Sequence, residues 1–143
     1  MVIHPRQEVR EAVVALLKRA VVSTDGRVFP TREVPWRRTE LPAIAVYALE
    51  ESSQQKNLDG DLERDVIVAV QAVTQLGEGI DDALDALSLE IETVMAEDPT
   101  LGGTAMDSFL GGTEIAVDEN TARPTGAIRL AYQIRYNTPA SMT

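Results

Sequence analysis

Few residues of this chain have the types and spacing that catalysis or ligand binding requires. The chain has no cysteine, so a Cys nucleophile or a thiolate metal site cannot form. His4, at the start of a predicted helix, is the only histidine, and no Gly-x-Ser-x-Gly motif supplies a serine nucleophile for it. The segment Gly77-Glu78-Gly79 lacks the third glycine of a dinucleotide-binding fingerprint, and no P-loop motif is present. We therefore expect no catalytic residue and no cofactor.

One acidic segment has part of the pattern of a calcium loop. Asn57, Asp59 and Asp61 have the spacing of the first ligands of such a loop. Leu62 and Val68, however, occupy the positions where the loop needs a glycine and a bidentate glutamate. The segment is therefore predicted to be a polar turn, and we expect no metal site.

A stripe of acidic residues lies on a predicted helix of residues 80–97. Asp81, Asp85, Ser88 and Glu92 follow steps of four, three and four residues, which places them on one face of the helix. The segment holds no Lys or Arg that could pair with them. Three interpretations stay open: a solvated face, a negative lumen wall or partner surface, and the site of a metal-dependent enzyme.

Basic residues gather in a different part of the chain. The segment from residue 27 to residue 38 holds one tryptophan and four arginines, and both types are enriched at interface hot spots. We interpret this group as a protein interface. Its members are Arg27, Arg32, Trp36, Arg37 and Arg38.

The net charge of −10 is distributed unevenly along the 143 residues. Residues 1–64 are neutral overall, residues 65–122 carry thirteen acidic and no basic side chains, and residues 123–143 carry three arginines and no acid. An acidic chain is a poor general binder of nucleic acid, because that affinity depends on Lys and Arg. An acidic middle and a basic loop suit a head-to-tail contact between identical subunits, and such contacts close into rings.

No apolar run is long enough to span a membrane, so no membrane contact is expected.

Hydrophobic periodicity predicts how these residues are positioned. We expect one domain over residues 1–143, of the α+β class, with an antiparallel or mixed sheet of four to five strands and two helices packed on one face. The helices are predicted at Pro5–Ala20 and Ile80–Glu97, and turns at Leu101–Thr104 and Leu110–Thr113. The strands are predicted at Val28–Phe29, Leu41–Leu49, Asp65–Val73, Thr113–Asp118 and Gly126–Thr138, with flexible loops at about 30–42 and 50–62.

Two of the predicted strands, Leu41–Leu49 and Asp65–Val73, are apolar on both faces. Two helices can cover only one face of the sheet. We therefore expect another subunit to cover the second face, unless its small alanine residues tolerate exposure to solvent.

Four segments of the chain, taken in order, resemble the tail terminator proteins of long-tailed phages, the lambda-type minor tail proteins. They are His4-Pro5-Arg6-Gln7-Glu8-Val9-Arg10, Arg27-Val28-Phe29-Pro30-Thr31-Arg32, Glu40-Leu41-Pro42-Ala43-Ile44-Ala45-Val46-Tyr47 and Asp98-Pro99-Thr100-Leu101-Gly102-Gly103.

This resemblance implies a small α+β protein that assembles as a hexameric ring on the end of the tail tube. The ring would stop polymerisation of the tube protein and offer a surface to head-completion proteins, and DNA would pass through it without specific binding. No reaction or cofactor is implied, so the protein is not expected to be an enzyme. It would act in the host cytoplasm during assembly and then in the virion tail. Another ring or neck component of a phage or injection particle is the alternative.

Overall fold

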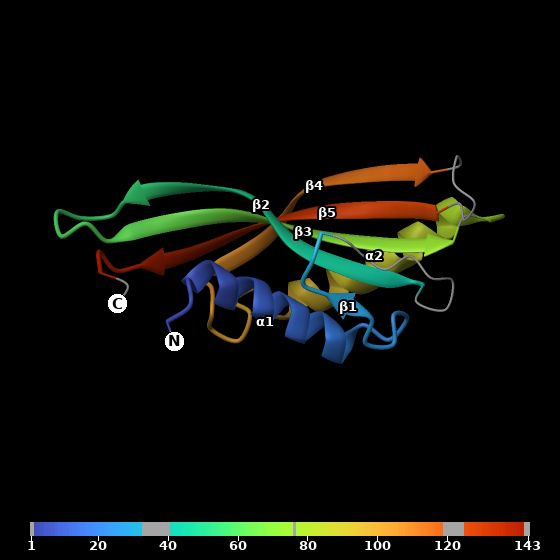
Figure 1. Cartoon of the computed structure of the whole chain (residues 1–143), viewed down its shortest axis with the longest axis horizontal. Coiled ribbons are helices and arrows are strands. Elements are labelled where there is room, and N and C mark those ends of the chain that lie inside the picture. Colours follow the sequence, from blue (N-terminus) through green and yellow to red (C-terminus); the bar gives the residue numbers. More distant parts are fainter. Residues whose placement is uncertain (1, 33–40, 76, 119–124, 142–143) are drawn as a thin grey trace.

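The computed structural model describes residues 2–32, 41–75, 77–118 and 125–141. These residues form two helices and five strands, which Figure 1 shows in their arrangement. Their order is α1 (Pro5–Ala20), β1 (Val28–Phe29), β2 (Ala43–Gln55), β3 (Leu62–Gln75), α2 (Ile80–Glu97), β4 (Asp107–Asp118) and β5 (Thr125–Thr138).

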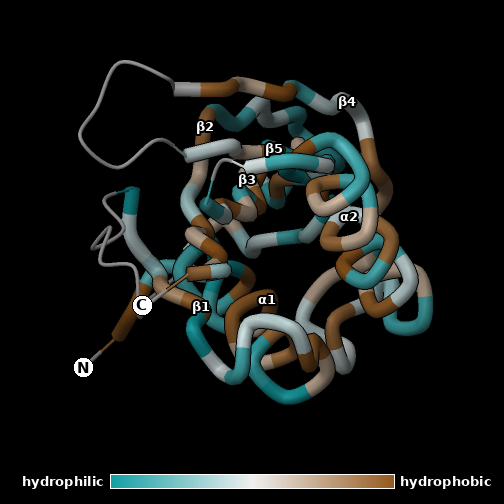
Figure 2. Tube along the Cα trace, turned by 90° about the vertical axis from the view of Figure 1, so that its right-hand side faces the viewer, coloured by the Kyte–Doolittle hydropathy of each residue, from teal (hydrophilic) through white to brown (hydrophobic). Residues whose placement is uncertain are grey.

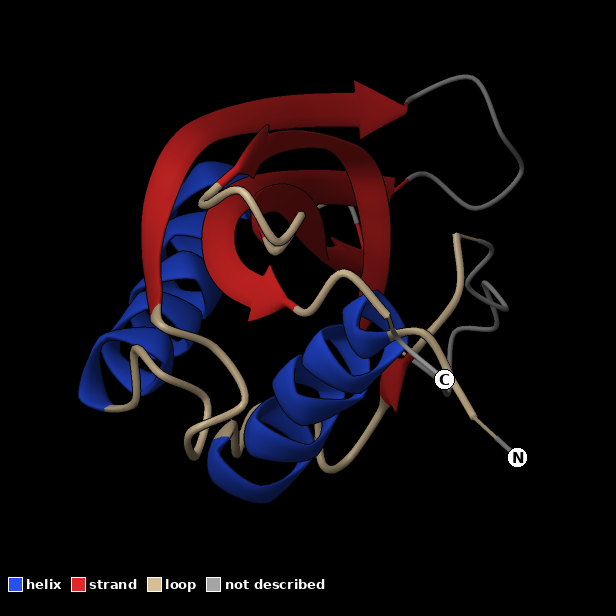
Figure 3. Cartoon of the chain, turned by 90° about the vertical axis from the view of Figure 1, so that its left-hand side faces the viewer, coloured by secondary structure: helices blue, strands red, loops and turns tan. Residues whose placement is uncertain are grey.

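The strands form one twisted sheet in the order β1-β2-β3-β5-β4. Strand β1 is parallel to β2, and all other neighbours are antiparallel. Both helices lie on the same side of this sheet, which curls over them (Figures 2 and 3). The predicted α+β class, with a mixed sheet and two helices on one face, is confirmed.

The core lies between the helices and the sheet. Alternating residues of β5 face it, and its outward residues include Arg129 and Arg135, as the period-two pattern predicts. Both helices have the bounds that their apolar stripes predict. The core side chains that these elements contribute include Val9, Val13, Leu17, Val68, Val70, Leu84, Ile91, Ile128, Leu130, Tyr132 and Ile134.

Strands β2 and β3 extend further than the sequence pattern predicts. The segment Glu50–Gln55 was expected to belong to a polar loop, but it continues β2 and pairs with β3 from Leu62 to Ile67. We call residues Glu50–Ile67 the arm, because their hairpin projects beyond both helices (Figure 1). Ser52 to Gln55 are exposed, so no hydrophobic pattern marks this half of β2, although backbone hydrogen bonds alone can maintain the strand.

Strand β4 also begins earlier than predicted. Leu101–Thr104 forms the predicted turn, but the similar segment Leu110–Thr113 lies inside β4. The register shifts between Leu110 and Gly112, as in a β-bulge. Glycine is frequent at bulges as well as in turns, so the sequence alone favoured the wrong one of the two.

The second face of the sheet is covered in part by the chain itself. Ala43 and Ala45 are buried there, and Phe29, Leu41 and Tyr47 pack against them. Coverage of the remaining face by another subunit stays a prediction.

Candidate interaction surfaces

A charged cluster joins the first turn of α1 to the sheet. Glu51 of β2 has only 10% of its side chain exposed, and it accepts hydrogen bonds from Arg6 of α1 at 2.7 Å and from Arg64 of β3 at 3.1 Å. Tyr136 of β5 donates a further hydrogen bond to it. Burial alone would raise the pKa of Glu51, but the hydrogen bonds outweigh burial and lower the pKa to about 2. This cluster has no signature in the sequence, because Glu51 is separated from Arg6 and Tyr136 by 45 and 85 residues and no short spacing links them.

Arg27, one of the predicted interface residues, is bound within the subunit. Its Nε donates to the carbonyl oxygen of Pro42 at 3.0 Å, and its guanidinium lies 3.9 Å from the Asp25 carboxylate. Only 26% of its side chain is exposed. Arg27 therefore joins the turn before β1 to the start of β2, which leaves little of it available to a partner.

Three arginines surround a hollow of about 330 Å³ between α1 and the edge of β2. Arg6 and Arg10 come from α1, and Arg32 comes from the segment after β1. Arg32 donates to the carbonyl oxygen of Ala48 at 2.5 Å, and its guanidinium carbon lies 5.0 Å from the centre of the Tyr47 ring. Within the described part of the chain, neither Arg10 nor Arg32 forms an ion pair. We call this feature the arginine hollow, and its guanidinium groups suit carboxylate partners.

The other predicted interface residues, Trp36, Arg37 and Arg38, lie outside the described residues. Their part in an interface stays a prediction.

The acidic residues of α2 run from solvent towards β4. Asp81 and Asp85 are exposed, whereas Ser88 is buried and donates to the half-buried Glu92 at 2.7 Å. Glu92 lines a hollow together with residues of β4, so this face of α2 is turned towards β4. We call Asp81, Asp85 and Glu92 the acidic stripe. Asp81 and Asp85 are therefore solvated, whereas Glu92 at the inner end of the stripe is partly covered. Whether the acidic stripe faces a lumen or a partner stays a prediction.

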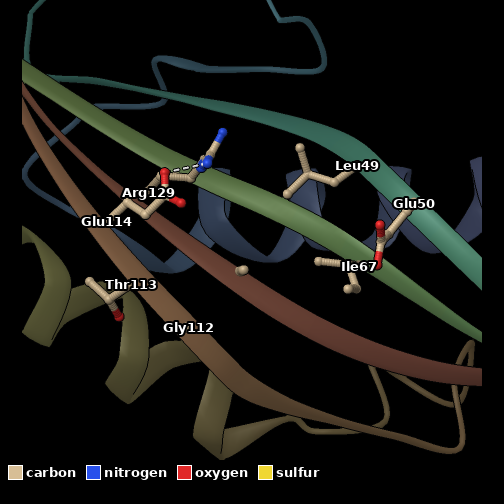
Figure 4. A pocket seen from close by; sticks show the side chains of 8 residues that line it. Leu49, Glu50, Ile67, Gly112, Thr113, Glu114 and Arg129 are labelled. Carbon is tan, nitrogen blue, oxygen red and sulfur yellow. Dashed lines mark hydrogen bonds and ion pairs between the residues drawn. The ribbon is translucent and has the colours of Figure 1, made fainter.

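A wider hollow of about 570 Å³ lies on the sheet face opposite the helices (Figure 4). Leu49 and Ile67 lie at one side of it, and the ion pair between Arg129 and Glu114 lies at the other. The bulge of β2 next to Leu49 and the bulge of β4 next to Gly112 border the hollow. Bulges bend and twist strands, which explains why the sheet is concave here.

No group of three or more His, Cys, Asp or Glu side chains in the described residues is arranged to hold a metal ion. None of the helices described is both long and apolar enough to cross a membrane.

Comparison with known proteins identifies the family. A family model described as phage minor tail protein U matches residues 4–136. The chain belongs to this family. Members are components of phage tails, so the chain is a structural component of the virion tail, and the resemblance noted in the sequence is confirmed at the level of the family.

Among solved structures, the chain is similar to one described as the virion of a native gene transfer agent particle. The sequence identity is 13% and the TM-score 0.49, over 91% of this chain and 95% of the other. No curated protein matches the chain.

Proposed function

We propose that this minor tail protein is a tail terminator. It forms a ring, in our proposal a hexamer, that caps the tail tube, ends tube polymerisation and provides the surface for head–tail joining. The family match over residues 4–136 carries this proposal, because it places nearly the whole chain among tail components. A structural role of this kind needs no catalytic group.

The distribution of charge supports assembly into a ring. The arginine hollow is formed by α1 and β2, whereas the acidic stripe lies on α2 and is turned towards β4. A subunit with two complementary and different surfaces forms heterologous contacts, and these close into rings when the rotation between subunits allows it.

The partners in this proposal are further copies of the chain, the tail-tube protein and a head-completion protein. Duplex DNA would pass through the ring without specific contacts, which agrees with a net charge of −10. Assembly would take place in the host cytoplasm before the ring becomes part of the virion.

Polymerisation of the tube in vitro tests the proposal. Tail-tube protein from the same particle is polymerised with and without the chain, and electron microscopy measures tube length and the fraction of capped ends. We expect shorter tubes with a ring at one end, and a hexamer by light scattering. The variant Val13→Asp, which places a charge in the core, is the inactive control.

Unchanged tube lengths with bare ends would contradict the proposal. Binding to head-completion protein without binding to tube ends would favour a neck component instead.

A further inference from the structure

The arginine hollow and the acidic stripe lie towards opposite edges of the sheet. Helix α1 packs against β1 and β2, at one end of the strand order, whereas α2 packs against β3 and β5, next to the edge strand β4. The end-on view separates α1 and β1 from α2 in the same way (Figure 2). Although α1 and α2 pack against each other, the arginine hollow lies beside β2 and the acidic stripe is turned towards β4. No ion pair joins the two surfaces within the described part of one copy, so each is placed to meet a neighbouring molecule.

We propose that the arginine hollow of one copy binds the acidic stripe of the next copy. This inference rests on the proposed ring and names the two surfaces that close it. Arg10 and Arg32 of one subunit face the carboxylates of its neighbour, whereas Arg6 stays bound to Glu51 of its own subunit. Each subunit uses both surfaces.

The two surfaces carry opposite charges, and within the described part of the subunit only Arg6 of the six charged residues has an ion-pair partner, Glu51. Helix α2 and strand β4 together hold nine acidic side chains and no Lys or Arg. In the described part of the chain, no Lys or Arg pairs with Asp81, Asp85 or Glu92. Arg10 likewise has no ion pair there, so a neighbouring carboxylate would supply its missing partner. Guanidinium groups bind carboxylates in a planar, two-point geometry, which favours one orientation of the contact.

Apolar surface next to the acidic stripe adds to the contact. Ile115 and Val117 of β4 are 55% and 42% exposed. Val117 pairs with Gly126, which lies directly against Ile80 at the start of α2. These side chains are therefore near the outer end of the stripe. An interface with an apolar part and charges beside it has the composition of a protein contact more than of a channel wall.

A second copy of the chain is the partner that this pair of surfaces fits. Because the surfaces differ and lie on opposite edges, their contact is heterologous, and its repetition gives a ring or a filament instead of a two-fold dimer. If the acidic stripe instead lined the lumen of the ring, it would not contact the arginine hollow of the next copy. Reversing the charge of the stripe would then leave the ring intact, whereas the proposed contact would be weakened.

Two complementary variants test the inference. One carries Arg10→Glu with Arg32→Glu, and the other carries Asp81→Lys with Asp85→Lys. Each variant alone places like charges at every contact, so we expect ring formation to weaken at least about tenfold. An equimolar mixture lets the two variants alternate, and every contact then joins opposite charges. We expect the mixture to restore the ring, measured by light scattering and by capping of tail tubes.

Matched controls separate these contacts from a general effect of charge. Lys18→Glu with Arg19→Glu makes the same change in net charge at the other end of α1, on exposed residues. Glu8→Lys with Glu11→Lys makes the opposite change on the same helix. Both controls should assemble as the wild type does, and thermal unfolding checks that each variant is folded.

The outcomes distinguish this inference from the proposed function. If the wild type forms rings but the mixture of variants does not, the proposed contact is wrong, whereas the proposed ring is still supported. If the lysine variant forms rings by itself, the acidic stripe faces the lumen or solvent, which also overturns the inference. If the wild type neither forms rings nor caps tubes, the proposed function fails instead.

Discussion

At the scale of single residues, Glu51 joins the first turn of α1 to the sheet, in addition to the apolar packing of that helix. We predict that Glu51→Gln lowers the free energy of unfolding by about 2 kcal/mol, because it weakens charge-assisted bonds to Arg6 and Arg64. Urea unfolding near neutral pH measures the loss. Glu50→Gln is the matched control: Glu50 is the preceding residue and is exposed, so its change should stay within about 0.5 kcal/mol.

The same carboxylate predicts acid sensitivity. The pKa of Glu51 is lowered to about 2 in the folded protein from an ordinary value of 4.5, so its ionised form stabilises the fold above that ordinary value. This contribution is lost as the pH falls from about 4.5 towards 2. We expect Glu51→Gln to flatten the stability curve in this window. An equally steep loss of stability in the variant would show that other groups cause the acid sensitivity.

His4 gives a second pH effect, at the start of α1. Its Nδ1 accepts the backbone N–H of Arg6 at 2.9 Å, which requires an unprotonated Nδ1. Burial lowers the pKa of His4 below 6.5, and the charges of Arg6 and Arg64 lower it further. The unfolded chain then binds the proton more readily, so this stabilisation is present above pH 6.5 and is lost as the pH falls through the lowered pKa.

His4→Asn keeps a good helix cap and removes the titrating group. We expect its melting temperature to fall less than that of the wild type when the pH is lowered from neutral to about 5. Equal falls in the two proteins would contradict the assigned role of His4.

At the scale of elements, Gly126 sets how closely α2 packs against β5. A Cβ atom at this position would lie 2.8 Å from Ile80 Cδ1 and Cγ1, so Gly126→Ala forces Ile80 to move. We predict a loss of about 1 kcal/mol, because the Ile80 side chain is half-buried and can yield partly. Gly112→Ala in β4 is the control, since its Cβ meets no atom within 4 Å. Urea unfolding of both variants compares them, and equal stabilities would contradict the tight contact.

Elements that bury one regular face could be predicted from the sequence, whereas elements with solvent on both sides could not. Apolar residues recur at helical spacing from Ile80 to Val94 and at every second position from Ile128 to Tyr136, and these are the residues that pack in the core. The helix α2 and the strand β5 therefore have nearly the bounds expected. The arm half of β2 carries Ser, Gln and Glu, and its strand pairing leaves no trace in hydropathy.

The candidate surfaces were predictable only in part, for a related reason. The acidic stripe is local on one helix, so spacing alone places Asp81 and Asp85 together. The arginine hollow joins Arg6 and Arg10 of α1 to Arg32, and that meeting depends on how α1 lies against the edge of β2. The sequence pattern therefore indicates Arg32 but not the two arginines of α1.

At the scale of the whole molecule, the opposite charges of the two edges predict how assembly depends on salt. Between about 0.01 M and 1 M salt the screening length falls from about 30 Å to 3 Å. If the arginine hollow and the acidic stripe hold the ring, its dissociation constant should rise at least about tenfold over this range. Light scattering of the wild type across a salt series measures this rise. Lys18→Glu with Arg19→Glu should give the same salt slope, because these residues lie outside the contact. A ring that tightens as salt increases would instead assign the contact to apolar surface such as Ile115 and Val117, since excluded salts strengthen apolar burial.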